Sequence, residues 1–220
     1  MAMQERAVRT RRAILEAAAR VFDRRGYQAA TITEILTVAG VTKGALYFHF
    51  QSKEDLAHGI VAEQDLKPYL PSQSSKLQEL VDIGMVHAYR VQTDLLVRAG
   101  VRLTLDSRAE GLDRTGPFLR WGGSTRELLD QAREQGELLP HVDTQETADL
   151  YVGSFAGVQS MSHIVSGYQD LGRRIQVLQR HVLPSIAVPS VIAALDLSPD
   201  RGRILSEQAL ASVAASEAVS

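Results

Sequence analysis

Hydrophobic positions recur at intervals of three and four residues along almost the whole of this 220-residue chain. In residues 7–25, Ile14, Ala18, Val21 and Phe22 form one such stripe, and arginines occupy the opposite face of the predicted helix. Further helical patterns cover about 76–92, 95–107, 115–136, 144–168, 171–197 and 200–215. No segment keeps the alternation typical of a strand, so the sequence predicts an all-α fold.

Two very short helices are predicted after the first one. Thr31-Ile32-Thr33-Glu34 has the form of a capping box and opens a helix that runs to about Val38. Ala39-Gly40-Val41 predicts a tight turn, and Thr42 can cap a second helix over residues 43–49. Helices of this length are not stable alone, so both are expected to pack against neighbours as a helix-turn-helix.

Glycine, proline and serine mark the expected ends of the other helices. Gly26 is expected to end the first helix, and Ser52 to open a longer one that runs to about Leu66. The segment KPYLPSQSS, residues 67–75, is predicted to be an interdomain loop, and Pro184 and Pro189 should kink or split the helix over 171–197. Other breaks are expected at 111–116, 140, 167 and 198–199.

The charge is unevenly distributed, although the net charge is only −2. Residues 1–55 hold nine Lys or Arg and six Asp or Glu, whereas the remaining 165 hold 15 and 20. A basic quarter on an acidic body indicates that one end of the molecule faces a polyanion, although chance alone can produce such a difference.

Composition excludes several other classes of protein. The chain has no cysteine, which removes disulfides, thiolate metal sites and a cysteine nucleophile. It lacks a signal-peptide pattern and any run of about 18 apolar residues, so we expect a cytoplasmic protein without a membrane partner.

The residue types of the second short helix are typical of a helix that contacts bases in the major groove of DNA. Ile32, Ile35, Leu36, Val41, Leu46 and Phe50 can face the core, which leaves a small and polar surface. Lys43 suits phosphates or base edges, small residues allow close approach of the backbone, and Tyr47 and His49 offer polar tips. In the alternative reading, Tyr47 and Phe48 are core aromatics and the basic residues form a solvated face. The predicted recognition residues are Thr42, Lys43, Gly44, Ala45, Tyr47 and His49, with Arg6, Arg9, Arg11 and Arg12 as a basic entry arm and Lys53 opening the next helix.

The segment TITEILTVAGVTKGALYFHFQSKEDLA resembles the N-terminal domain of the TetR family of transcriptional regulators. This resemblance implies a homodimer with one helix-turn-helix head per subunit on a pseudo-palindromic operator, with Thr31, Thr33 and Lys53 as phosphate contacts. We expect a DNA-binding domain over residues 1–52 and a ligand-binding and dimerisation domain over 53–220, with the long late helices as the dimer interface.

The remainder of the chain resembles the γ-butyrolactone autoregulator receptors, a TetR subgroup from antibiotic-producing filamentous bacteria. The resemblance is carried by LVRAGVRLTLD, GPFLRW, GELLPHV, ADLYVGSFAGVQ and LPSIAVPSVIAALDLS. It implies a small neutral lactone or furan signal, and a pocket lined by Trp121, whereas on pattern alone a lone tryptophan is more often a core residue. Phe155, in an apolar run, is another ligand candidate. The polar candidates, which could instead face solvent or cap helices, are Gln64, Gln159, Ser160 and Ser162.

Catalysis and cofactors are not expected. Gly153-Ser154-Phe155-Ala156-Gly157 places its serine wrongly for a nucleophile elbow, and the two glycines are better explained by close helix packing or space for a ligand. The six histidines have no paired metal spacing, and no phosphate or dinucleotide loop is present.

The sequence therefore predicts a ligand-released repressor, and the resemblance implies that it controls secondary-metabolite genes in a quorum-sensing system. A TetR-type sensor of an antibiotic or drug-like metabolite is the alternative, and a helical enzyme or interaction protein with a vestigial head is the rival from another class.

Overall fold

The computed structural model describes residues 2–64, 72–106, 109 and 111–218, with side chains from residue 6 to 212. Within these ranges the chain forms eleven helices and no strand, which confirms the all-α prediction. The helices are α1 (Ala2–Ala29), α2 (Ile32–Ala39), α3 (Lys43–His49), α4 (Lys53–Ala62), α5 (Lys76–Thr93), α6 (Leu95–Leu105), α7 (Thr115–Glu134), α8 (Thr144–Ser166), α9 (Leu171–Ile186), α10 (Pro189–Ala194) and α11 (Arg201–Ala218).

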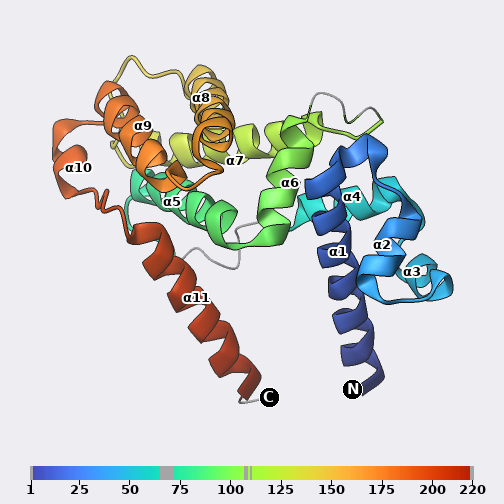
Figure 1. Ribbon diagram of the computed structural model, residues 1–220. Helices are drawn as coiled ribbons and strands as arrows, with labels where there is room; N and C mark the ends of the chain where they lie inside the picture. Colours follow the sequence, from blue (N-terminus) through green and yellow to red (C-terminus); the bar gives the residue numbers. More distant parts are fainter. Residues whose placement is uncertain (1, 65–71, 107–108, 110, 219–220) are drawn as a thin grey trace. The chain divides into compact units, whose positions relative to one another are not determined.

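The chain divides into two compact units. The first unit comprises Met1–Asp65 and Asp94–Thr115, and the second comprises Leu66–Thr93 and Gly116–Ser220. The first unit therefore includes α6 as well as α1–α4, because α6 packs against α1 and α4 (Figure 1). The functional boundary expected between residues 52 and 53 stays a prediction.

One apolar core holds the first unit together. Ile14, Leu15 and Phe22 of α1 are buried against Ile35 of α2 and Leu46 of α3. Phe50, Leu56, Ile60, Leu96 and Leu103 complete this core. The short helices α2 and α3 thus gain their stability from tertiary packing, as their length requires.

Helix α11 is fixed to α5 in the second unit by one glycine and one buried ion pair. A Cβ on Gly202 would lie 2.1 Å from the carbonyl oxygen of Met85, so only glycine permits this approach. Arg201 donates to the fully buried carboxylate of Asp82, and its Nη2 lies 2.8 Å from Oδ2. Gln78 also donates to Asp82, which satisfies the buried charge.

Helix ends agree with the predicted breaks at most positions, with two corrections. The expected break at Gly26 is confirmed as a kink (φ 75°), but the first helix starts at Ala2 rather than at residue 7 and continues after the kink to Ala29. The expected split of the segment over 171–197 is also confirmed, because α9 continues past Pro184 to Ile186 and Pro189 opens α10. Helix α4 ends at Ala62 rather than near Leu66, and residues 67–71 of the expected loop lie outside the described residues.

Candidate functional site

Side-chain caps fix the turn between α2 and α3. The Thr31 hydroxyl accepts from Glu34 N at 3.2 Å, and Thr42 accepts in the same way from Ala45 N. Gly40 closes α2 in the left-handed region at φ 64°, which favours glycine. Both expected caps and the expected turn are confirmed, and they hold α3 at a defined angle to α2.

The outer face of α3 presents the residues that the sequence predicted there. Leu46 and Phe50 are buried, whereas Lys43 and Gly44 are exposed and Tyr47 is 43% exposed. The Lys43 ammonium lies 5.8 Å from the centroid of the Tyr47 ring, so the two side chains share one surface. A Cβ on Gly44 would meet nothing within 4 Å, so the backbone there is open to an incoming surface.

Phe48 was not among the predicted site residues. Its ring is 80% exposed and meets His49 edge-on at 5.0 Å between centroids. The alternative reading in which Phe48 and Tyr47 are core aromatics is therefore wrong, because α3 is too short to bury more than one side.

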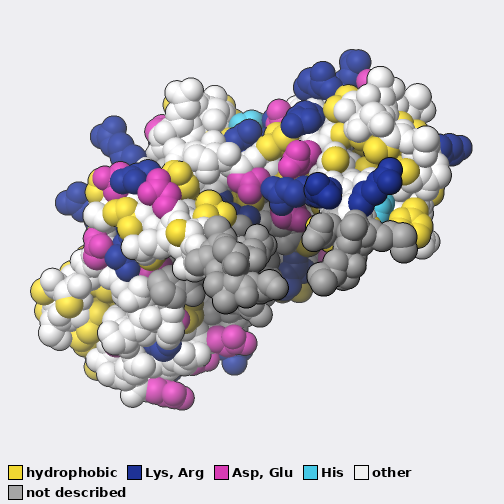
Figure 2. All heavy atoms as spheres, turned by 90° about the horizontal axis from the view of Figure 1, so that it is seen from below, with side chains coloured by type: hydrophobic (Ala, Val, Ile, Leu, Met, Phe, Trp, Pro, Cys, Tyr) yellow, Lys and Arg dark blue, Asp and Glu magenta, His cyan; other side chains and the backbone are white. Residues whose placement is uncertain are grey.

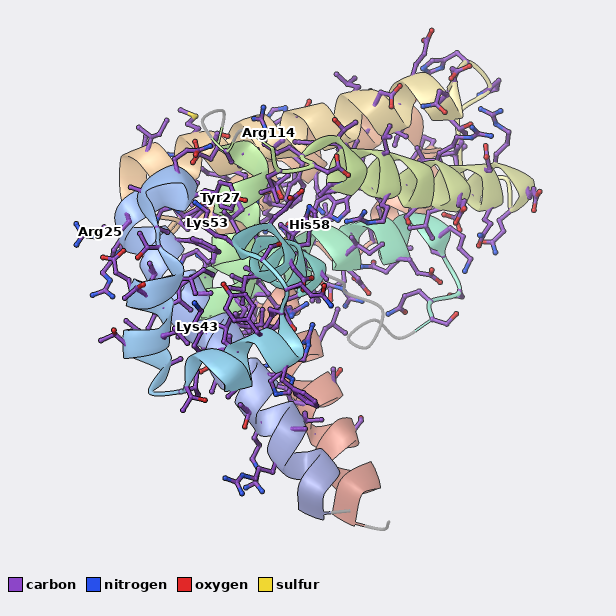
Figure 3. All side chains as sticks on the ribbon, turned by 90° about the vertical axis from the view of Figure 1, so that its right-hand side faces the viewer. Arg25, Tyr27, Lys43, Lys53, His58 and Arg114 are labelled. Atoms are coloured by element: carbon purple, nitrogen blue, oxygen red, sulfur yellow. The ribbon has the colours of Figure 1, made fainter. Side chains whose placement is uncertain are left out.

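The first unit carries further exposed basic side chains. Arg6 and Arg9 are exposed on α1, and Arg12 pairs with Glu16 at 3.2 Å. Figure 2 shows Lys and Arg side chains on the surface of the molecule, and Figure 3, seen from another side, labels Lys43 and Arg25 of the first unit. Thr33 is exposed at the start of α2, while the Thr31 hydroxyl is hydrogen-bonded to the backbone N–H and the carboxylate of Glu34.

Lys53 has a structural role that the sequence did not predict. Its ammonium donates to the carbonyl oxygens of Tyr27 (3.0 Å), Gln28 (3.2 Å) and Ala30 (3.3 Å), where α1 ends. It also lies 4.6 Å from the centroid of the Tyr27 ring. Figure 3 labels both residues. An ammonium has three protons, so this cap uses all of them. The phosphate contact implied for Lys53 stays a prediction.

The second unit contains an aromatic cluster formed by His87 of α5, Trp121 of α7, and Tyr151 and Phe155 of α8. The His87 ring meets Trp121 at 4.4 Å and Phe155 at 5.7 Å between centroids, both edge-to-face. Trp121 lies 5.6 Å from Phe155, which in turn lies 6.2 Å from Tyr151. The structure thus brings Trp121 and Phe155 together, as the sequence predicted, and adds two residues it missed.

Gln179 of α9 completes the cluster. Its Nε2 donates to the Tyr151 hydroxyl at 3.2 Å and to the carbonyl oxygen of Val81 at 3.1 Å. Burial raises the pKa of Tyr151 to about 12, so its hydroxyl stays protonated. No local sequence pattern marked His87, Tyr151 or Gln179, because they lie on three helices that meet only in the fold.

The other predicted ligand residues lie in different surroundings. The Ser162 hydroxyl donates to Asp170 Oδ1 at 2.6 Å, and this bond, with that of Ser166, lowers the pKa of Asp170 to about 2. Gln159 is buried one turn beyond Phe155, and Ser160 is partly buried beside it. Gln64 belongs to the first unit, where its amide donates to Val61 O and to Thr104 Oγ1 at 3.4 Å. Ligand contacts by these four residues stay predictions.

No group of three or more His, Asp or Glu within the described ranges could hold a metal ion. Among the helices that the structure describes, none is long and apolar enough to cross a membrane.

Residues 14–60 match the family model for the TetR family of bacterial regulatory proteins. The A-factor receptor protein of Streptomyces griseus is 45% identical over 195 residues, which are 88% of this chain and 69% of that one. TylP, a TetR regulator from Streptomyces fradiae, is 45% identical and aligns with a TM-score of 0.85 over 93% of this chain and 99% of its own. A γ-butyrolactone receptor described as ArpA-like, and CprB from Streptomyces coelicolor in complex with its operator, each align at 30% identity and a TM-score of 0.70 over 92% of this chain and 99% of theirs.

The protein is therefore an all-helical regulator with an N-terminal helix-turn-helix. It belongs to the TetR family of transcriptional regulators, and its relatives are regulators and receptors rather than enzymes.

Proposed function

We propose that this chain is a repressor that binds a pseudo-palindromic operator through α3 and is released by a small neutral γ-butyrolactone or related furan. The observation that carries the proposal is the exposed face of α3, where Lys43, Gly44 and Tyr47 stand on a helix held at both ends by its neighbours. A seven-residue helix of this form fits the major groove, where its first residues reach base edges. CprB, which was solved with its operator, supports the same use of this head.

The basic residues of the first unit supply the sequence-independent part of operator binding. Arg6 and Arg9 lie exposed on α1, on the same helix that supports α3. Each Lys or Arg that meets a phosphate releases counterions, so the affinity should fall steeply with salt. The other predicted contacts are Thr31, Thr33, Thr42, Ala45, His49 and Lys53.

A second copy of this chain is the proposed partner of α8. Leu150, Gly153, Gly157, Met161 and Ile164 follow one another at three- and four-residue spacing on this helix. All five are exposed, Ile164 at 82%, and a Cβ on either glycine would meet nothing within 4 Å. An apolar stripe with this exposure fits a self-complementary interface, and a twofold dimer matches the symmetry of a palindromic operator.

The aromatic cluster is the proposed ligand site. Trp121 offers an indole N–H beside a flat apolar surface, and Phe155 and His87 extend that surface. The similarity to the A-factor receptor and to a γ-butyrolactone receptor favours a lactone over an antibiotic. Control of antibiotic genes in the cytoplasm of a producing bacterium would follow from this ligand.

Release requires that the ligand prefer the conformation that cannot bind the operator. A preference of about 100-fold shifts the equilibrium by about 2.7 kcal/mol, which empties a moderately occupied operator.

Selection of bound duplexes from a random pool tests the function, with and without lactones. We expect a palindromic consensus whose enrichment is lost when the ligand is added, and a salt dependence that indicates several phosphate contacts. Ile164→Lys should yield monomers that bind the consensus weakly, whereas Leu210→Lys, at an exposed leucine of α11 outside the two late helices, should stay dimeric. Absence of any enriched sequence at 150 mM salt would refute the repressor, and release by an antibiotic but no lactone would favour the drug sensor.

A further inference from the structure

Three buried polar atoms in the second unit have no hydrogen-bond partner among the described residues. They are Nδ1 and Nε2 of His87 and Oε1 of Gln179, and both side chains are completely buried. Buried polar atoms are almost always hydrogen-bonded, since an unsatisfied one destabilises the fold. Three such atoms in one region indicate that a bound ligand supplies their hydrogen-bond partners.

These atoms belong to one continuous cluster. His87 touches Phe155, Phe155 touches Tyr151, and the Tyr151 hydroxyl is bound by Gln179. Gly84 lies one turn before His87 on α5, and a Cβ there would lie 2.6 Å from Gln179 Nε2 and 3.1 Å from the Tyr151 hydroxyl. The glycine therefore lets Gln179 and Tyr151 reach the same stretch of α5 that carries His87.

The protonation state of His87 defines what the cluster can bind. Burial, with a smaller contribution from Arg90, lowers the pKa of His87 to about 3, so the ring is neutral at physiological pH. A neutral imidazole has one N–H donor and one acceptor nitrogen, and Gln179 Oε1 is a further acceptor. The cluster thus has more unused acceptors than donors.

We infer that His87 and Gln179 bind the hydroxyl-bearing end of a neutral, largely apolar ligand whose remainder lies against Trp121 and Phe155. A hydroxyl both donates and accepts, so it satisfies an acceptor of the cluster as well as the imidazole N–H. A ketone or carboxylate in its place only accepts and leaves Gln179 Oε1 unsatisfied. The inference rests on the proposed function, because it specifies the chemistry of that regulator's ligand.

A matched pair of lactones tests this preference. The probes are γ-butyrolactone with a 1-hydroxyoctyl side chain at C2 and the same lactone with the corresponding 1-oxo side chain, which differ only in alcohol against ketone. Binding is followed by calorimetry and by fluorescence of Trp121, the only tryptophan, whose ring lies against His87. We expect the full-length protein to bind the alcohol at least about tenfold more tightly than the ketone, because the ketone leaves a buried acceptor unpaired.

Two variants assign the preference to these side chains. Gln179→Met keeps the length of the side chain and removes the acceptor, and it should reduce the alcohol-to-ketone ratio to near one; His87→Phe should reduce it in the same direction. Gln176→Met is the matched control, since Gln176 lies on the same helix but donates to Leu197 O outside the cluster. This control should keep the full ratio.

The outcomes separate this inference from the repressor itself. Three results would each overturn the inference and leave the DNA-binding function intact. They are equal binding of both lactones, an unchanged alcohol-to-ketone ratio in Gln179→Met, and binding of neither lactone by a protein that still selects a palindromic operator. Failure to select any operator would instead overturn the proposed function, whatever the lactones do.

Discussion

The surface of α3 and the aromatic cluster of the second unit differ in whether their polar atoms have hydrogen-bond partners. Around α3, Thr31, Thr42 and Ser52 each cap a helix, and the remaining polar side chains are in contact with solvent. In the cluster, His87 and Gln179 are buried with polar atoms that have no hydrogen-bond partner within the described part of the chain. The polar atoms of the first region are thus satisfied by the fold and by solvent, whereas those of the second would be satisfied by the proposed ligand. The proposed function, which combines a DNA-binding surface with a ligand site, requires this difference.

Gly44→Leu should have the largest effect, because it blocks the exposed side of α3 without disturbing the fold. No atom lies within 4 Å of the added Cβ, and replacing a helical glycine stabilises the protein by about 0.5–1 kcal/mol. A bulky side chain would nevertheless keep the backbone from the groove floor, and we expect at least a 100-fold loss of operator affinity, or about 2.7 kcal/mol. Titration of the selected operator by fluorescence anisotropy measures it.

Gly123→Leu provides the control, since Gly123 is an equally open glycine within α7. Undiminished operator affinity in Gly44→Leu would mean that α3 does not approach DNA through this face.

Lys53→Met should lower the free energy of unfolding by about 2.5 kcal/mol. The substitution removes a charged donor from three carbonyl oxygens at the end of α1 and leaves them without that partner. Lys43→Met, at an exposed lysine that lies over Tyr47, should change stability by less than about 0.5 kcal/mol. If urea denaturation gives the two variants the same midpoint, Lys53 is not a cap, and the phosphate contact implied by resemblance becomes its main role.

The first region could be predicted from the sequence because its signals are local. A capping threonine, a glycine in a tight turn and a helical stripe each act within four or five residues, so Thr31, Gly40 and Thr42 were all assigned correctly. The second region could be predicted only in part. Trp121 and Phe155 came from family resemblance and an apolar run, while His87 and Gln179 lie 92 residues apart in sequence (179 − 87) and had no shared pattern.

The exact position of one helix end could not be predicted for a related reason. Pro184 and Pro189 predict that the segment over 171–197 kinks or splits, but not that α9 ends at Ile186, beside the bridge between Ala187 and Leu138. That contact comes from a residue far along the chain, which periodicity cannot register.

Gly84→Ala should lower the free energy of unfolding by about 2 kcal/mol, because the new methyl group would overlap Gln179 and Tyr151. Gly44→Ala, the same substitution in the open helix, should raise it by about 0.5–1 kcal/mol. Thermal denaturation of both variants measures the contrast directly. Two changes of the same sign would show that the cluster is looser than the packing around Gly84 implies.

The smallest expected effect is a dependence of stability on pH that comes from His87. The folded pKa is about 3, below the value of 6.5 for a free histidine, so only the unfolded chain binds this proton between those values. The contribution of His87 to stability is therefore complete above pH 6.5 and is lost as the pH falls below it, by about 1.4 kcal/mol between pH 7.5 and 5.5. His87→Phe removes this term and keeps the other five histidines. The difference in unfolding free energy between the two proteins should change by that amount from pH 7.5 to 5.5. If the two plots of unfolding free energy against pH are parallel, His87 takes up a proton in the folded protein. It would then not be the neutral partner that the proposed hydroxyl requires.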